Sequence, residues 1–347
     1  MYDLAKYSFA NAKIRAMLSR LLHPDEFSRL LDATSIDDVL ESLKNTPYAF
    51  LAEHFSGNSF NLRAIEKALI KNDIALYRKV CGTITTRRER DFLSLLTSRY
   101  EIEELKAVLR IWHNKRDVNL DEYLLGDEIT HPLDYRKILA CQTIEEIILL
   151  LDETAYKRPL MDARDRYKEK NASFYLEAAL DRDYYVRARS LIENLSSTDK
   201  RVALRILGIE IDIENINWLI RLRKYYVLGI GEMLPLIIPG GEKITTDVVR
   251  NFYATDGVGK VVDAVALGPY ARIKELVNEN VAFVESFLYE ILLREVRRTL
   301  AGFPFTIGTV LGYLILKNRE TRNIVSLLYG KNYGFGRDTL LSLMHFG

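Results

Sequence analysis

Two stretches of the chain repeat one pattern: residues 35–48 read SIDDVLESLKNTPY, and residues 143–156 read TIEEIILLLDETAY. Each begins with a hydroxyl residue, an isoleucine and two acids, and each ends in Thr, a small residue and Tyr after an apolar run. A hydroxyl side chain before paired acids is typical of a helix N-terminus, where it caps free amides and the acids favour the positive helix end. We therefore interpret both stretches as packing units whose acids cap helices rather than catalyse a reaction.

The repeated pattern extends over a longer segment. Residues 23–48 align with residues 131–156 without a gap, at an offset of 108 residues that brings two His-Pro pairs into register. A fainter third copy lies 114 residues further on; it loses the paired acids and keeps the closing tyrosine, Tyr270. Because proline disfavours helix at the preceding residue, we expect His23 and His131 to act in turns rather than in catalysis.

Two further elements recur in the same order at similar offsets. They are residues 65–69, 176–180 and 284–288, followed by residues 102–110, 213–221 and 323–329. A period of this length is domain-sized and exceeds the 20 to 50 residues of a solenoid repeat. The sequence therefore predicts three similar helical domains around a pseudo-threefold axis. The expected boundaries are 1–22 for an N-terminal helix packed on the repeats, and 23–130, 131–244 and 245–347 for the three domains.

The secondary structure is predicted to be helical throughout. Apolar residues recur three and four positions apart, strand-like alternation is scarce, and the chain has only 8 prolines and 18 glycines to interrupt helices. The uncharged stretch 299–316 is shorter than the roughly 20 apolar residues of a membrane span and contains Pro304. We predict an all-α protein in which this stretch is a buried helix preceded by a turn at residues 302–304.

The composition argues against several classes of function. A net charge of +1 gives no long-range attraction for nucleic acid, and Cys81 and Cys141 belong to no CxxC pair or Cys/His cluster that would bind zinc. No HExxH, GxSxG or P-loop motif occurs, and we interpret the GVGK at residues 257–260 as a weakened helix start in the third copy. We expect no catalytic residue, cofactor, metal or direct nucleotide binding. The N-terminus lacks the features of a signal peptide, so we expect a cytoplasmic protein.

Four arginines occupy comparable places in the repeats. Arg110 and Arg221 close the helices of the last repeated element, and Arg15 and Arg322 lie near the same place in looser copies. Arginine near a helix C-terminus is stabilised by the helix dipole, which is one explanation of the pattern. The other is that a threefold arrangement directs all four arginines at one partner, which makes them our candidate interface residues.

The order of three segments resembles the C subunit of the rotary V/A-type ATPases, the counterpart of the d subunit of eukaryotic V-ATPases. The segments are YSFANAKIR at residues 7–15, LGIEIDIENI at residues 207–216, and VLGYLILKNRETRNI at residues 310–324 followed by YGK at residues 329–331. Asn318 departs from the family, which usually has an acid after the lysine. The resemblance covers essentially the whole chain.

The resemblance implies a fold and a role. The fold would be a funnel of three similar helical domains without a catalytic site. The protein would be a non-catalytic central-stalk subunit, peripheral on the cytoplasmic face of the membrane. It would seat on the proteolipid rotor ring, receive the central-shaft subunits in its hollow, and transmit torque between ion translocation and ATP synthesis or hydrolysis. A socket that meets a ring of different symmetry needs approximate contacts, so we expect a polar, salt-sensitive interface.

Two alternatives remain at this point. One is an unrelated all-helical scaffold that binds partner helices, which fits the composition and the repeats equally well. The other is an enzyme that uses the tyrosine-rich stretches at residues 183–185 and 224–226. Tyrosines on amphipathic helices are usually core or rim residues, which favours the first alternative over the second.

Overall fold

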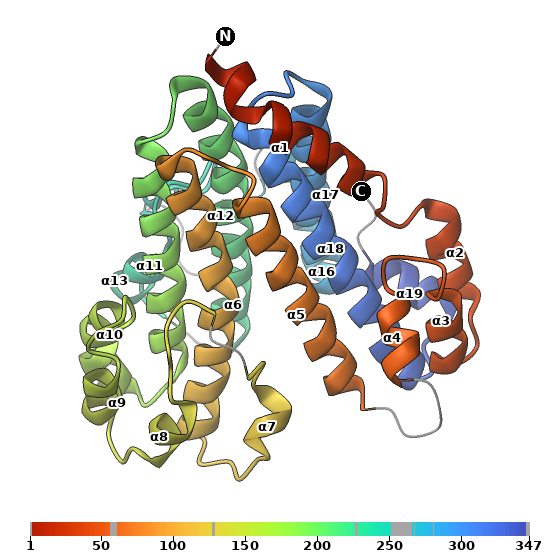
Figure 1. Cartoon of the computed structure of the whole chain (residues 1–347). Coiled ribbons are helices and arrows are strands. Elements are labelled where there is room, and N and C mark those ends of the chain that lie inside the picture. Colours follow the sequence, from red (N-terminus) through yellow and green to blue (C-terminus); the bar gives the residue numbers. More distant parts are fainter. Residues whose placement is uncertain are drawn as a thin grey trace.

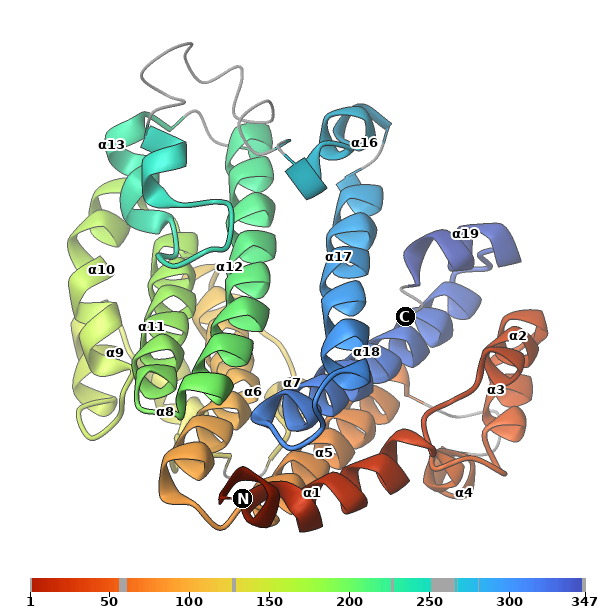
Figure 2. The same cartoon turned by 90° about the horizontal axis from the view of Figure 1, so that it is seen from above.

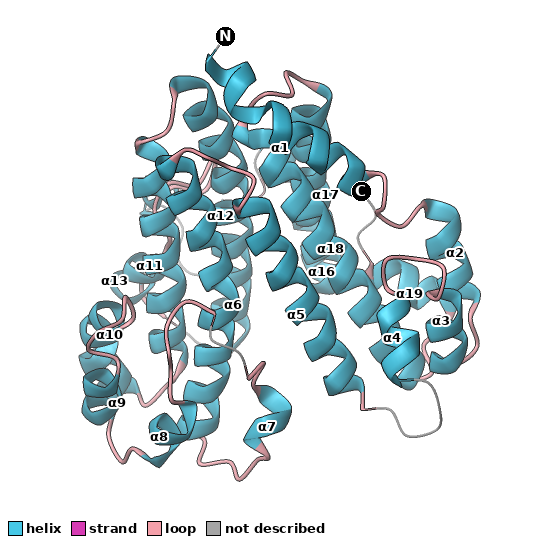
Figure 3. Ribbon diagram, viewed as in Figure 1, coloured by secondary structure: helices cyan, strands magenta, loops and turns pink. Residues whose placement is uncertain are grey.

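The computed structural model describes residues 2–55, 61–126, 129–225, 228–250, 266, 268–279 and 281–344. Within these ranges every regular element is a helix and no strand occurs (Figure 3). The predicted all-α class is therefore confirmed. The fainter third copy, residues 245–270, falls largely on residues 251–265 and 267, which lie outside the described residues. Residues 245–250, 266 and 268–270 are described, among them the closing Tyr270.

The described helices succeed one another along the chain as follows. They are α1 (Tyr2–Leu18), α2 (Pro24–Asp32), α3 (Ile36–Ser42), α4 (Ala49–Phe55), α5 (Leu62–Cys81), α6 (Arg87–His113), α7 (Leu120–Tyr123), α8 (Tyr135–Ala140), α9 (Ile144–Leu150), α10 (Lys157–Lys170), α11 (Phe174–Glu193), α12 (Ser197–Tyr225), α13 (Ile230–Met233), the 3-10 helices η1 (Leu234–Leu236) and η3 (Gly268–Tyr270), α16 (Ile273–Glu279), α17 (Val281–Ala301), α18 (Ile307–Asn332) and α19 (Arg337–Leu343).

The paired acids of the two opening stretches cap helices, as their sequence indicates. In α3 the Ser35 hydroxyl accepts a hydrogen bond from the Asp38 amide at 3.1 Å, and the Asp38 carboxylate accepts one from the Ser35 amide at 3.0 Å. In α9 the Thr143 hydroxyl accepts from the Glu146 amide at 3.4 Å. Hydrogen bonds from Thr34 and Ser35 hold the pKa of Asp38 below its usual value. The capping interpretation is confirmed.

The uncharged stretch near the C-terminus forms parts of two helices. α17 ends at Ala301 and α18 begins at Ile307, so the predicted turn lies between them. Beyond the turn, Leu311, Tyr313 and Leu314 are buried against the rest of the molecule. None of the described helices combines the length and apolar character that crossing a bilayer requires.

Six long helices organise the molecule (Figures 1 and 2). Each packs on the next in the order α5, α6, α11, α12, α17, α18, and α18 packs on α5. The order therefore closes on itself, since a helix from the end of the chain meets one from near its beginning. α1 runs along α18, α2 packs on α19 beyond the other end of α18, and α3 packs on α18 itself (Figure 1).

The apolar core has two parts. The larger one extends through α6, α9 to α12, α17 and the N-terminal half of α18. The smaller one joins the two ends of the chain, because Leu30, Leu43 and Leu69 from the first helices pack with Leu327 and Leu340 from the last two. Burial of this apolar surface is the main force that holds the first and last segments together.

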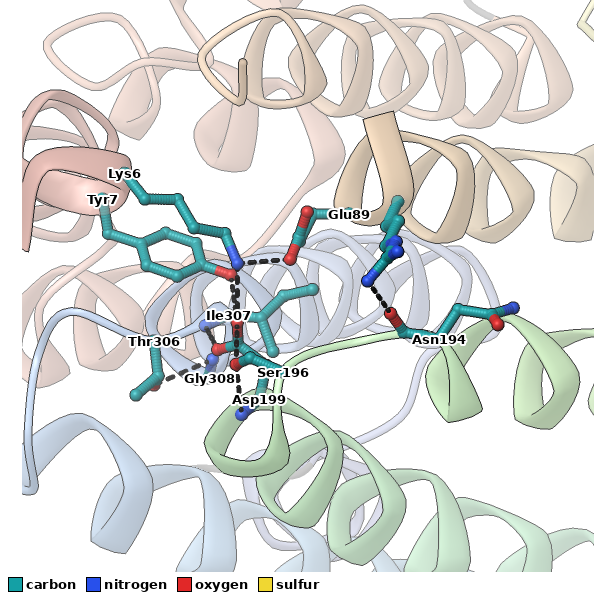
Figure 4. Close-up of polar contacts among 10 residues, drawn as sticks. Lys6, Tyr7, Glu89, Asn194, Ser196, Asp199, Thr306, Ile307 and Gly308 are labelled. Atoms are coloured by element: carbon teal, nitrogen blue, oxygen red, sulfur yellow. Dashed lines mark hydrogen bonds and ion pairs between the residues drawn. The ribbon is translucent and has the colours of Figure 1, made fainter. Parts of the chain in front are cut away.

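Helix α1 is anchored by a buried polar cluster (Figure 4). The Lys6 ammonium donates to Asp199 of α12 at 2.9 Å and also pairs with Glu89 of α6. The Tyr7 hydroxyl donates to the same Asp199 carboxylate at 2.8 Å, and the Ile307 amide at the start of α18 donates to its second oxygen at 2.8 Å. One carboxylate therefore connects α1, α12 and α18.

The three tyrosines that close the repeated segments make the same contact. Each is at most 1% exposed and donates its hydroxyl hydrogen to a buried carboxylate on a long helix. The pairs are Tyr48 with Glu320 of α18 at 2.6 Å, Tyr156 with Glu101 of α6 at 2.7 Å, and Tyr270 with Asp212 of α12 at 2.8 Å. Each repeated segment is thus bound to the long helix of a different repeat.

Backbone amides complete these tyrosine–carboxylate contacts. The amides come from the residues just before each repeated segment: Leu22 donates to Glu320 at 2.5 Å, Thr130 and His131 to Glu101 at 2.7 and 2.8 Å, and Lys243 and Ile244 to Asp212 at 2.9 and 2.8 Å. His131 thus sits in a turn, as predicted, and its ring also contacts Glu101. A buried carboxylate that accepts several hydrogen bonds is well satisfied, so these contacts fix how the repeats meet.

Candidate functional site

A cavity of about 990 Å³ opens between α5, α6 and α18. Arginine, lysine and glutamate side chains line it together with several tyrosines, among them Tyr100, Tyr123, Tyr329 and Tyr333. We refer to it as the α18 cavity. The lining thus combines charged side chains with apolar surface, as a protein–protein interface does.

The structure brings together two of the four predicted interface arginines. Arg110 and Arg322 both line the α18 cavity, from α6 and α18. Arg15 is exposed on α1 and does not line it. Arg221 belongs to α12, and its side chain lies outside the described residues. That all four arginines face one partner therefore stays a prediction.

Ion pairs bind α6 to α11 beside the cavity. Arg110 pairs with Glu177 at 3.0 Å, and Lys106 pairs with Asp181 and Glu103, each at 2.8 Å. Burial raises the pKa of Asp181 to about 6, although the Lys106 charge acts to lower it. Because Arg110 already pairs with Glu177, it is less suited than an unpaired arginine to bind an anion of a partner.

A second set of ion pairs connects α6 to α12. The Arg99 guanidinium lies 3.0 Å from Glu214 and 3.8 Å from Glu210. These side chains are buried only in part, with exposed fractions of 30%, 23% and 21%. Desolvation raises the pKa of Glu210 although Arg99 opposes it. The inner face of α12 is therefore acidic and its charge is compensated by α6.

Helix α18 carries two arginines one turn apart, Arg319 and Arg322, and both line the α18 cavity. The Arg319 side chain is 8% exposed and its guanidinium lies 3.4 Å from the centre of the Tyr289 ring. Burial lowers the pKa of Arg319 to about 10. The sequence pattern did not single out Arg319; its position three residues before Arg322 on a helix was the signal that could have found it.

An aspartate is buried in the wall of the α18 cavity. One oxygen of Asp73 accepts a hydrogen bond from the Thr321 hydroxyl at 2.9 Å, and its other oxygen has no hydrogen-bond partner among the described residues. Desolvation raises the pKa of Asp73 to about 7. Its side chain is fully buried, so it is poorly placed to exchange protons with a substrate in the cavity.

The remaining chemical candidates from the sequence that the structure describes are buried or partly buried. Burial raises the pKa of Cys81 to about 11, which keeps this thiol protonated and unreactive at neutral pH. Tyr184 and Tyr185 are buried on α11, and burial raises the pKa of both. In the part of the chain that the structure describes, no three His, Cys, Asp or Glu side chains are grouped so that they could hold a metal ion.

Comparison with known proteins adds the family. The model of the ATP synthase (C/AC39) subunit family matches residues 10–343. The chain belongs to this family. The resemblance drawn from the sequence is confirmed. The three segments that carry it lie in α1, α12 and α18, which are the helices that meet at Asp199.

Relatives from archaea match this C/AC39 family chain along most of its length. The A-type ATP synthase C subunit of Methanosarcina acetivorans is 28% identical over 97% of this chain and 92% of its own length. The protein of the same name from Thermococcus onnurineus is 27% identical over 93% of this chain and 86% of its own length. That from Archaeoglobus fulgidus is 24% identical over 95% and 93%. The alternative of an unrelated helical scaffold is therefore wrong.

Proposed function

We propose that this chain is a non-catalytic central-stalk subunit of a V/A-type rotary ATPase. It connects the central shaft to the proteolipid ring of the membrane and transmits torque between ion translocation and ATP synthesis or hydrolysis. It lies on the cytoplasmic face of the membrane as a peripheral subunit. Membership of the C/AC39 family carries this proposal, together with the names of relatives that align over nearly their whole length.

The proposed shape is a funnel of three similar units around a pseudo-threefold axis. The units are residues 23–130, 131–244 and 245–347, with residues 1–22 as a helix that packs on them. Two observations support it: the closed packing order of the six long helices, and the three tyrosine–carboxylate contacts that each bind one unit to another. Such a closed arrangement resists shear, which a torque-transmitting coupling needs.

The α18 cavity is the proposed seat of the shaft. Its lining of charged side chains and apolar surface agrees with a protein partner, which the charged side chains would select. Arg110 and Arg322 are the predicted interface residues that it contains, while Arg15 would face another partner or solvent. The non-catalytic role is supported by the burial of Asp73, Tyr184 and Tyr185 and by the raised pKa of the Cys81 thiol, which keeps it protonated.

The proposal is tested by purifying the tagged chain from native membranes at low ionic strength and identifying its partners by mass spectrometry. We expect the shaft subunits and the proteolipid of the ring to co-purify. In a salt series the ring should dissociate first, because the expected ring interface depends on distributed charge pairs that salt screens. Recovery of the chain without any rotary ATPase subunit at low salt would contradict the proposal.

A further inference from the structure

The three long helices that correspond in the repeats carry different charges at matched positions. We align α6, α12 and α18 on the carboxylates that accept hydrogen bonds from the closing tyrosines. These carboxylates are Glu101, Asp212 and Glu320. Two residues after each carboxylate the chain has Glu103, Glu214 and Arg322. The first two repeats therefore present an acid where the third presents an arginine.

A second matched position also carries a positive charge in the third repeat and none in the first two. One residue before each alignment carboxylate the chain has Tyr100, Ile211 and Arg319. At these two matched positions α18 alone carries positive charges. They are Arg319 and Arg322, and both line the α18 cavity. The three corresponding helices therefore differ in charge at these positions, even though their sequences are related by the repeat.

The acids of the first two repeats are already neutralised. Glu103 pairs with Lys106, and Glu214 pairs with Arg99. By contrast, neither Arg319 nor Arg322 forms an ion pair with any residue in the described parts of the chain. Glu285 of α17 also lines the cavity, and its charge raises the pKa of Arg319 only as the smallest contribution.

The acids of the other repeats face Arg322. Burial acts to lower the pKa of Arg322 and so does the Arg99 charge, but Tyr289 and the carboxylates Glu103 and Glu214 raise it overall. Of these groups, Glu103 lines the α18 cavity together with Arg322. Arg322 is exposed within that cavity, whereas Arg319 behind it is nearly buried and also borders a second cavity of about 490 Å³.

A guanidinium in a partly desolvated wall recognises a carboxylate well. Its planar donors match the two carboxylate oxygens, and a hydrogen bond to a charged group is roughly twice as strong as a neutral one. The Arg319 guanidinium lies 3.4 Å from the centre of the Tyr289 ring, a contact that restricts it and so lowers the entropic cost of orienting its donors. The pair Arg319 and Arg322 is therefore suited to bind an anion, and no described residue forms an ion pair with either guanidinium.

We propose that Arg319 and Arg322 bind a carboxylate of the central shaft and thereby fix one of three rotational settings of the shaft in the socket. This inference rests on the proposed function. In the other two settings the same shaft carboxylate would meet Glu103 or Glu214, which are already paired with Lys106 and Arg99, so no arginine without an ion pair would be there to bind it. A socket with threefold backbone similarity thus transmits torque without slipping between equivalent positions.

The first test measures the affinity of the full-length chain for the shaft subunits of its own complex. Arg322→Glu, which places in the third repeat the acid of the other two, should weaken binding by about tenfold or more at low salt. Arg322→Gln should give a smaller loss of the same sign. The matched control Arg182→Glu changes an exposed arginine of α11 outside the cavity lining and should stay within about twofold. Circular dichroism and thermal melting verify that each variant is folded.

The second test identifies the shaft residue. Acidic residues at the inserted end of the shaft are changed one at a time to lysine and paired with Arg322→Glu. One of them should restore binding to within about threefold of the unmodified pair, because the two charges are exchanged. A loss of binding in Arg322→Glu that no shaft reversal restores would overturn the assignment of a shaft carboxylate.

The third test reads the rotational setting. Ala107 and Ser326 occupy matched repeat positions and both line the cavity. In a chain with Cys81 and Cys141 replaced by Ser, one cysteine at the end of the shaft should cross-link to Ala107→Cys or to Ser326→Cys, and not to both. With Arg322→Glu added, cross-links should form at both positions.

The outcomes separate the two proposals. If the unmodified chain binds the shaft and Arg322→Glu binds it within about twofold, the carboxylate site is wrong and the socket function stands. Equal cross-linking at Ala107→Cys and Ser326→Cys in the unmodified cavity also refutes the single setting. If the unmodified chain does not bind the shaft, the proposed function and this inference are both wrong.

Discussion

Two of the tyrosine–carboxylate contacts do the same structural task with different chemistry. In the closing contact, Tyr48 donates to Glu320 at 2.6 Å, and the Lys317 ammonium lies 2.5 Å from the Tyr48 hydroxyl and 3.1 Å from Glu320. In the neighbour contact, Tyr156 donates to Glu101 at 2.7 Å, and the His131 ring lies 2.6 Å from Glu101. The closing contact thus has a buried ion pair, with both side chains 5% exposed.

The two contacts also differ in how far apart their residues lie along the chain. The closing contact joins residues 272 positions apart, whereas the neighbour contact joins residues 55 positions apart. Bringing the more distant pair together costs about 1.4 kcal/mol more in chain entropy, at about 0.6 kcal/mol for each doubling of length. The contact that closes the packing order therefore has the additional charge interaction where the entropic cost is greater.

Removing the two glutamates should have the largest effect. Glu320→Ala should lower the free energy of unfolding by about 3–5 kcal/mol, because it leaves the buried Lys317 charge without its carboxylate. Glu101→Ala should cost about 1–3 kcal/mol, the desolvation penalty of donors left unpaired. Urea denaturation measures both. Adding Lys317→Met to Glu320→Ala should recover part of the loss, and an equal cost for both glutamates would contradict the comparison.

Asp73 should make the stability near the closing contact depend on pH. Its pKa is raised from 3.8 to about 7, so the folded state binds the proton more tightly than the unfolded state does. Stability is therefore lost as pH rises from about 4 to about 7, by up to about 4 kcal/mol in total. Asp73→Asn should be more stable than the parent protein at pH 8 and nearly equal to it at pH 4.

The check is urea denaturation of both proteins across that pH range. In the variant, Thr321 can still donate to the side-chain carbonyl oxygen of the asparagine, so the substitution retains the hydrogen bond that Asp73 now accepts. Parallel stability curves for the two proteins between pH 4 and pH 8 would show that Asp73 is not a buried acid.

Deleting the tyrosine hydroxyls tests whether the three contacts are equivalent. Tyr48→Phe, Tyr156→Phe and Tyr270→Phe should each cost about 1–3 kcal/mol, because each leaves a buried carboxylate with one donor fewer. Tyr48→Phe should cost most, since it also removes the hydroxyl oxygen that accepts a hydrogen bond from the buried Lys317 ammonium. Tyr333→Phe is the control; this tyrosine is 69% exposed and its hydroxyl should contribute less than about 0.5 kcal/mol. Chemical denaturation at pH 7 provides the ranking.

The helix caps should have the smallest effect and should not distinguish the first two repeats. Ser35→Ala and Thr143→Ala each remove the side chain that accepts an amide of the first turn and should cost about 1 kcal/mol. The control Ser190→Ala lies in the exposed part of α11 and should be neutral or slightly stabilising. Thermal melting suffices here, and a neutral result for both caps would refute their role.

The fold class and the caps could be predicted because they depend on local signals. The helical spacing of apolar residues, the Ser and Thr at residues 35 and 143, and the closing tyrosines are all visible within a few turns of chain. The partners of those tyrosines are not local. Asp212 lies between Ile211 and Ile213 on a helix, where nothing in the spacing marks one acid as buried. Only its matched offset to Glu101 and Glu320 could have indicated it.

Only part of the candidate site could be predicted from the sequence, for a similar reason. Arg110 and Arg322 were found because arginines recur in the last repeated element, and both line the α18 cavity. Only Arg110 lies near a helix end, since Arg322 is in the middle of α18. Arg319 was missed because a single arginine on a long helix is usually solvated. Its burial depends on Tyr289 of α17, a contact that arises only when the helices pack.

The central claim is that this chain holds the shaft in the α18 cavity and seats it on the membrane ring. Electron cryomicroscopy of the complex purified from native membranes tests this most directly. The account predicts density of a shaft helix between α5, α6 and α18, beside Arg322, with the chain in contact with the proteolipid ring. A map in which the chain lies at the periphery of the complex, with the α18 cavity empty, would contradict it.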